Sequence, residues 1–150
     1  MKSNYQILIL LFILFHASSS FASHAKQTSN IIYAEKMNQD GTVQQLKLDL
    51  YEPTGSNQNK IVYLMHGGGF LEGDRGDFIE YSNYLVKQGF TVCNLDYRLI
   101  PEIYHEQLTY DIYATSLVFA MDDLDSAIRH IHDNSDIYGL NDYDIISLSI

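Results

Sequence analysis

The chain has 150 residues with 19 acidic and 9 basic side chains, which gives a formal net charge of −10. This charge, with no basic cluster in the sequence, argues against a nucleic-acid or anionic-membrane partner. A hydrophobic content of 46% without repeats predicts one folded domain. Cys93 is the only cysteine, so an intrachain disulfide and a Cys-rich zinc site are excluded, and we expect no metal and no cofactor.

Residues 1–22 are predicted to be a secretory signal peptide. Lys2 precedes an apolar run from Ile7 to Phe15, and Ser20 and Ala22 supply the small residues that a cut after Ala22 requires. A membrane anchor is disfavoured, because a span needs roughly 20 apolar residues. We therefore expect export to the periplasm or the medium, with no membrane association after cleavage.

The N-terminal part of the remaining chain predicts a hairpin. Residues 23–29 are small and polar and predict a flexible lead-in, before a domain over residues 30–150. Two strand-like segments, 30–36 and 42–51, are joined by a connection that ends in Gly41. In the second, Val43, Leu46, Leu48 and Leu50 share an apolar face, and Lys47 and Asp49 point the other way.

The middle of the chain predicts a strand–helix–strand unit. Residues 61–65 are apolar on both faces, as in a strand inside a parallel sheet. A helix follows, with Asp77 as its N-cap, Glu80 as the capping-box partner and Gly89 at its end; its apolar stripe contains Phe78, Tyr81 and Leu85. Residues 90–97 form the next strand, on which Cys93 is expected to be buried.

The C-terminal third predicts one long helix and a last strand. Leu117, Met121, Leu124, Ile128 and Ile131 recur at helical spacing, so we expect them to form the buried stripe of that helix, whereas residues 104–114 are ambiguous. Residues 144–150 are a final strand candidate. Alternating strands and helices predict an α/β fold with a mostly parallel sheet.

The motif with the clearest chemistry is His66-Gly67-Gly68-Gly69-Phe70, which follows a buried strand directly. The carboxyl ends of strands in open α/β sheets are where ligands bind. Glycines at this position allow main-chain amides to turn toward one point and to donate hydrogen bonds to an oxygen that becomes negatively charged. A plain flexible turn is the alternative interpretation of a glycine triplet.

The motifs in order resemble the α/β-hydrolase superfamily. HGGGF is followed by Gly73-Asp74, by Asp96-Tyr97-Arg98-Leu99-Ile100-Pro101-Glu102 and by an aspartate-bearing helix, as in esterases related to hormone-sensitive lipase and in bacterial feruloyl/acetylxylan-type carboxylesterases. The resemblance implies the N-terminal half of an α/β-hydrolase fold, with five strands, and a serine carboxylesterase activity on a small-molecule ester.

The resemblance also implies roles for individual residues. Gly68 and Gly69 would donate to the oxyanion, and Gly67 and His66 would shape the turn, with His66 orienting the loop. Arg98 and Glu102 would be scaffold residues, such as an internal ion pair or a loop anchor. Asp96 would be structural, as would the helix aspartate, which we assign to Asp123, with Asp111 and Asp122 as alternatives.

The sequence departs from the family at the nucleophile. No G-x-S-x-G elbow is present, and Ser147 and Ser149 lack its flanking glycines. We therefore expect a fragment that lacks the Ser/Asp/His triad and is inactive alone. Two other hypotheses are a non-catalytic interaction protein derived from a hydrolase and an amidase or aryl formamidase of the same fold. The sequence does not indicate the oligomeric state.

Overall fold

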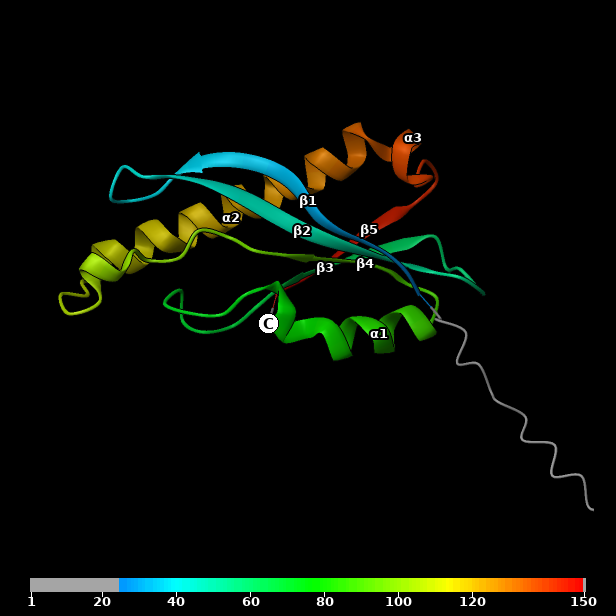
Figure 1. The fold of residues 1–150 in the computed structure, drawn as a ribbon, viewed down its shortest axis with the longest axis horizontal. Coiled ribbons are helices and arrows are strands. Elements are labelled where there is room, and N and C mark those ends of the chain that lie inside the picture. Colours follow the sequence, from blue (N-terminus) through cyan, green and yellow to red (C-terminus); the bar gives the residue numbers. More distant parts are fainter. Residues whose placement is uncertain (1–24, 150) are drawn as a thin grey trace, which may run out of the picture.

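A computed structural model describes residues 25–149 as a five-stranded sheet with the strand order β1-β2-β4-β3-β5 (Figure 1). The predicted signal peptide and its cleavage site lie outside the described residues. The strands are β1 (Ala25–Met37), β2 (Val43–Pro53), β3 (Lys60–Met65), β4 (Thr91–Leu95) and β5 (Asp144–Ser149). The helices are η1 (Arg75–Phe78), α1 (Ile79–Lys87), η2 (Glu102–Tyr104), α2 (Tyr110–Asp133) and α3 (Ser135–Tyr138).

The sheet is mixed. β1 and β2 form the predicted antiparallel hairpin, and β2 also runs antiparallel to β4. β3 runs parallel to both of its neighbours, β4 and β5, so the strand–helix–strand unit predicted around it is confirmed. The parallel part of the sheet is therefore centred on the strand that leads into the glycine motif.

The expected flexible lead-in over residues 23–29 is wrong from Ala25 onward, because β1 begins there. Ala25 and Lys26 pair with Pro53 and Glu52 of β2, and the Lys26 ammonium lies 2.8 Å from the Glu52 carboxylate. A strand at the edge of a sheet tolerates small and polar side chains, because its backbone forms hydrogen bonds with the neighbouring strand and water solvates its outer face. Low hydrophobicity was therefore a poor guide to disorder at this position.

The two faces of the sheet carry separate hydrophobic clusters, because side chains alternate along each strand. On β3, Ile61, Tyr63 and Met65 belong to the cluster that includes Ala120, Ala127 and Ile131 of α2. Val62 and Leu64 belong to the cluster that includes Val86 of α1. α1 and α2 thus cover opposite faces of the sheet (Figure 1).

The helix predicted near residue 117 is α2, which begins earlier, at Tyr110, with Thr109 as its N-cap. Its buried residues are Ser116, Ala120, Asp123, Ala127 and Ile131. The predicted aliphatic stripe is therefore confirmed at Ile131 and in part at Leu124 and Ile128, which pack against the core, and is wrong at Leu117 and Met121. Leu117 and Met121 are 52% and 64% exposed, and Leu124 and Ile128 are half-buried.

The predicted cap before α1 is also displaced. Asp74 is the N-cap of the 3₁₀ turn η1 that precedes α1, and Asp77 is its capping-box partner. The N-cap of α1 itself is Phe78, which makes no side-chain capping bond. The residues that α1 buries are Ser82 and Val86, whereas Tyr81 is exposed. Gly89, with φ of +89°, ends the helix as predicted.

Candidate active site

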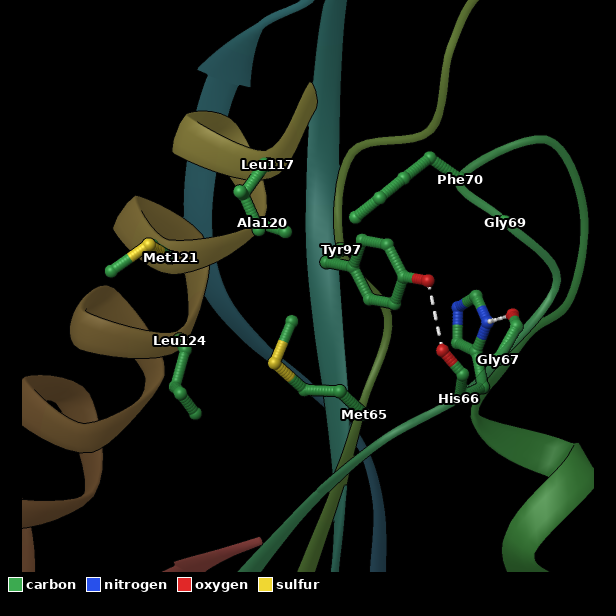
Figure 2. Close-up of a pocket in the computed structure, with 10 residues that line it drawn as sticks. All are labelled: Met65, His66, Gly67, Gly69, Phe70, Tyr97, Leu117, Ala120, Met121 and Leu124. Atoms are coloured by element: carbon green, nitrogen blue, oxygen red, sulfur yellow. Dashed lines mark hydrogen bonds between the residues drawn. The ribbon is translucent and has the colours of Figure 1, made fainter. Parts of the chain in front are cut away.

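The HGGGF motif leaves the carboxyl end of β3, between β4 and β5. The loop that follows, here called the glycine loop (residues 66–74), turns through left-handed backbone at Gly68, Gly69 and Phe70, with φ of +106°, +63° and +65°. Glycine adopts such angles without strain, and a run of them reverses the chain within a few residues. The loop is therefore a tight turn above the end of the sheet (Figure 2).

His66 is buried at the base of the glycine loop, with 3% of its surface exposed. Its Nδ1 donates a hydrogen bond of 2.9 Å to the carbonyl oxygen of Gly67. Its own carbonyl oxygen accepts a hydrogen bond of 2.8 Å from the Tyr97 hydroxyl, and the two rings stack with centroids 4.4 Å apart (Figure 2). His66 therefore contacts the loop in the way that an orienting role requires.

Two glycines of the loop are required by close contacts. A Cβ on Gly68 would lie 2.1 Å from the carbonyl oxygen of Glu72, and a Cβ on Gly73 would lie 2.4 Å from Nδ1 of His66. The Leu71 amide donates to the Gly68 carbonyl at 3.1 Å and closes the turn. Gly67 and Gly69 have open space where a Cβ would stand. The loop thus packs against itself at Gly68 and Gly73 and opens at Gly67 and Gly69.

The amides of Gly68 and Gly69 donate no hydrogen bond to any other group within residues 25–149. Gly67, Gly68 and Gly69 are exposed, so these amides are available to water or to a ligand. Each amide could donate one hydrogen bond to an anionic oxygen.

An apolar cavity of about 240 Å³ lies between the glycine loop and α2 (Figure 2). Its walls are mostly hydrophobic side chains from β3, the loop and the exposed flank of α2, together with Gly67 and Gly69; they include Met65, Phe70, Leu117, Met121 and Leu124. Gly68 borders a neighbouring polar cleft with Glu72 and Asp77, and Gly67 lines both the cavity and this cleft. The predicted triplet thus lies where the apolar cavity and the polar cleft meet. Burial raises the pKa of the Tyr97 hydroxyl, which stays a neutral donor at the cavity wall.

The far end of the glycine loop is tied to β4 and β2. The Arg75 amide donates to the Asp96 carboxylate at 2.9 Å, and the Arg75 guanidinium forms an ion pair with the same carboxylate. Nε of Arg75 lies 3.1 Å from Asp49, a largely buried residue of β2. Asp96 therefore has the structural role that the sequence predicted, as the anchor of the loop's exit.

Arg98 holds α2 against the sheet. Its guanidinium lies 2.7 Å from the carboxylate of Asp123 and 2.8 Å from that of Asp122, and it donates to the carbonyl of Met37 at 2.9 Å. Asp123 is fully buried, so the structure selects Asp123 over Asp111 and Asp122 as the helix aspartate of the motif. Glu102 is exposed; the partners of Arg98 are these aspartates.

Residues 25–149 include no group of three or more His, Cys, Asp or Glu side chains that could hold a metal ion. In the same range, no helix has both the length and the apolar composition that crossing a bilayer demands.

The sequence profile of BD-FAE matches residues 48–149, a range that includes the glycine loop, the Asp96–Arg98 segment and α2. The chain belongs to this family. BD-FAE proteins are α/β-hydrolases of the esterase type related to hormone-sensitive lipase, as the motifs predicted. No curated protein is recognisably similar to the chain in sequence.

Three solved esterases share the fold. A bacterial heroin esterase is 22% identical, with a TM-score of 0.57 over 89% of this chain and 37% of its own. Esterase B from Lactobacillus rhamnosis is 23% identical, with a TM-score of 0.56 over 84% and 35%. Esterase 2 from Thermogutta terrifontis is 21% identical, with a TM-score of 0.55 over 84% and 40%.

These matches confirm the α/β-hydrolase fold. This chain spans well under half the length of those three esterases.

The sequence interpretation missed the contact between Tyr97 and His66. A signal was available, because Tyr97 follows a strand predicted to run parallel to the one before HGGGF, and parallel strands end at the same edge of a sheet. A tyrosine at that point is well placed to reach the loop.

Proposed function

We propose that this chain supplies the oxyanion-binding part of a serine carboxylesterase. The observation that carries the proposal is the glycine loop at the end of β3, with free amides at Gly68 and Gly69 and buried contacts at His66. These amides, together with that of Gly67, would hold the negative charge that develops on an ester carbonyl oxygen during attack by a serine. One preorganised donor of this kind is worth about 3 to 4 kcal/mol of the activation barrier.

The cavity beside the loop supports an ester with an apolar group as the substrate. Its walls are predominantly hydrophobic, and Gly67 and Gly69 border it, so an apolar acyl or alcohol group in the cavity would place the ester carbonyl near the loop. His66 would keep the loop in its shape through its contacts with Gly67 and Tyr97.

The nucleophile, the acid and the base would come from sequence outside these 150 residues. No G-x-S-x-G occurs in the chain. The oxyanion donors by themselves would leave a residual effect too small to detect easily, so the 150-residue chain alone is inactive under this proposal.

The test compares the 150-residue chain with a longer form made from the coding DNA that follows codon 150. Both are assayed with p-nitrophenyl acetate and p-nitrophenyl butyrate. We expect turnover that a serine reagent abolishes in the longer form and none in the short one. A natural product that stops at Ile150 and is soluble and inert would favour a non-catalytic interaction protein. Hydrolysis of formanilide in preference to the esters would favour an amidase.

We also propose that the protein is exported after cleavage behind Ala22. The mature chain would then begin at Ser23, two positions before β1 starts at Ala25, so cleavage would leave the edge strand whole. N-terminal sequencing of protein recovered from the periplasm or medium tests this. A mature terminus inside β1, or an uncleaved cytoplasmic product, contradicts it.

A further inference from the structure

We infer that Tyr97 is a positioning residue for the oxyanion-binding amides, acting through the orientation of the His66 and Gly67 peptide groups. This inference rests on the proposed function for its catalytic consequence, whereas the positioning itself is a property of the described chain. Neither the family resemblance nor the motif order assigns this role to Tyr97.

The geometry of the peptide bond connects Tyr97 to the amides. In a trans peptide the C=O of one residue and the N–H of the next point in opposite directions. The Tyr97 hydroxyl holds the His66 carbonyl, so the Gly67 N–H must point away from Tyr97. His66 Nδ1 holds the Gly67 carbonyl, so the Gly68 N–H must point away from the His66 ring.

Both peptide orientations depend on Tyr97. Its hydroxyl fixes the first peptide directly, and its ring, stacked on His66 at 4.4 Å, fixes the imidazole that holds the second. A hydrogen bond between neutral groups that are both buried is costly to break, because each group then loses its partner without regaining water. The pair therefore restrains two consecutive amides of the loop.

Strand register explains why Tyr97 lies at this point. Met65 of β3 pairs with Leu95 of the parallel strand β4. β3 and β4 therefore end side by side at the same edge of the sheet, which places Asp96 and Tyr97 next to His66 and Gly67.

The same segment holds the loop at two further points. Asp96 binds Arg75, and the Ile100 amide donates to the Phe70 carbonyl at 2.7 Å. Residues 96–100 thus fasten the entrance, the middle and the exit of the glycine loop.

A simple packing role for Tyr97 makes a different prediction. Tyr97 is 4% exposed, and a phenylalanine ring would fill the same space and keep the stack on His66. Only the hydroxyl separates the two roles. Tyr97→Phe is therefore the informative variant, since it preserves volume and removes one hydrogen bond.

Tyr63→Phe is a matched control. Tyr63 lies on β3, the strand that leads into the loop, and its hydroxyl is buried with no hydrogen-bond partner among the described residues. Like Tyr97→Phe, the control removes one tyrosine hydroxyl from the hydrophobic cluster that contains both residues, but it removes no hydrogen bond to the glycine loop.

The first measurement uses the 150-residue chain labelled with ¹⁵N. We expect Tyr97→Phe to lower the backbone order parameters of Gly67 and Gly68 from about 0.85 toward 0.6 or below, and Tyr63→Phe to leave them unchanged. The second uses the longer, serine-containing form. There Tyr97→Phe should lower kcat by about 10- to 100-fold and leave KM within about twofold. The reason is that misplaced amides bind the oxyanion of the transition state less well but bind the ground-state ester almost as before.

The two proposals fail in different ways. Order parameters and kcat that match those of Tyr63→Phe would overturn the role of Tyr97 and leave the esterase proposal intact. A loop loosened by Tyr97→Phe in a protein that hydrolyses no ester in any form would support the positioning role and refute the esterase function.

Discussion

Arg98 and Asp123 form a buried ion pair that joins the segment after β4 to the middle of α2. The Asp123 carboxylate accepts the Arg98 backbone amide at 2.8 Å and the guanidinium at 2.7 to 3.1 Å, and it is fully buried. The guanidinium also lies 3.9 Å from the centre of the Phe119 ring. The Arg98 side chain thus fixes the position of α2, the helix that forms one wall of the apolar cavity.

Replacing Asp123 with asparagine should destabilise the chain by about 3 to 5 kcal/mol. The substitution leaves the buried guanidinium without its closest carboxylate, and a buried charge that loses its partner costs far more than the pair contributes. Urea unfolding followed by far-UV circular dichroism measures the change.

Asp122→Asn is the matched control on the same guanidinium. Its side chain is 49% exposed, and a hydrogen bond from Lys36 is the main cause that lowers the pKa of its carboxyl. Because water screens this pair, the expected loss is within about 1 kcal/mol. Equal losses of unfolding free energy in the two variants would contradict the prediction that the buried pair with Asp123 matters more for stability than the exposed pair with Asp122.

The glycine loop should tolerate alanine at Gly67 and reject it at Gly68. A Cβ at position 68 would meet the Glu72 carbonyl and require a φ of +106°, so Gly68→Ala should cost about 1 to 3 kcal/mol or more. Gly67→Ala has open space and should stay within about 0.5 kcal/mol. Urea unfolding of both variants measures the difference, and similar stabilities would mean that the loop does not pack on itself as described.

The fold was predictable where the sequence pattern is local. β2 and β3 and the turns at Gly41 and Gly89 follow from alternation and glycine placement, and the structure confirms them. The HGGGF motif lies at the end of a parallel strand, as its position after an apolar run indicated.

Features that depend on long-range partners were not predictable in this way. The stripe of α2 was assigned to Leu117 and Met121 because large aliphatic residues usually face a core, but Asp123 must lie under Arg98, and this contact fixes the rotation of the helix. Likewise, Tyr97 follows an apolar strand and resembles an ordinary core residue in the sequence. Only the register of β3 against β4 reveals what its hydroxyl contacts.

Cys93 should be inert in the native chain. It lies in the middle of β4 with no exposed surface, as the sequence predicted, and burial raises the pKa of its thiol. Reaction with a thiol reagent requires the thiolate and access to it. We expect no labelling by 5,5′-dithiobis(2-nitrobenzoic acid) at pH 8 until urea unfolds the chain, after which one thiol per chain reacts. Rapid labelling of the folded protein would contradict the burial.

His130 should make the chain less stable in mild acid. Burial lowers the pKa of its imidazole below the ordinary value of 6.5, although the charge of Asp133 opposes this, and Nε2 lies 3.3 Å from the Tyr138 hydroxyl. The unfolded state therefore binds more protons than the folded state once the pH falls below 6.5. The contribution of His130 is fully present above that pH and is lost as the pH falls through the folded-state pKa.

His130→Gln removes this titration and should make Tm fall less between pH 7.5 and pH 5 than it does in the unmodified chain. His132→Gln is the control, because that side chain is 77% exposed and its removal changes little that is buried. Scanning calorimetry at several pH values gives both slopes. The same slope for His130→Gln as for the unmodified chain would mean that the imidazole pKa is the same in the folded chain as in the unfolded one, and would contradict the burial of His130.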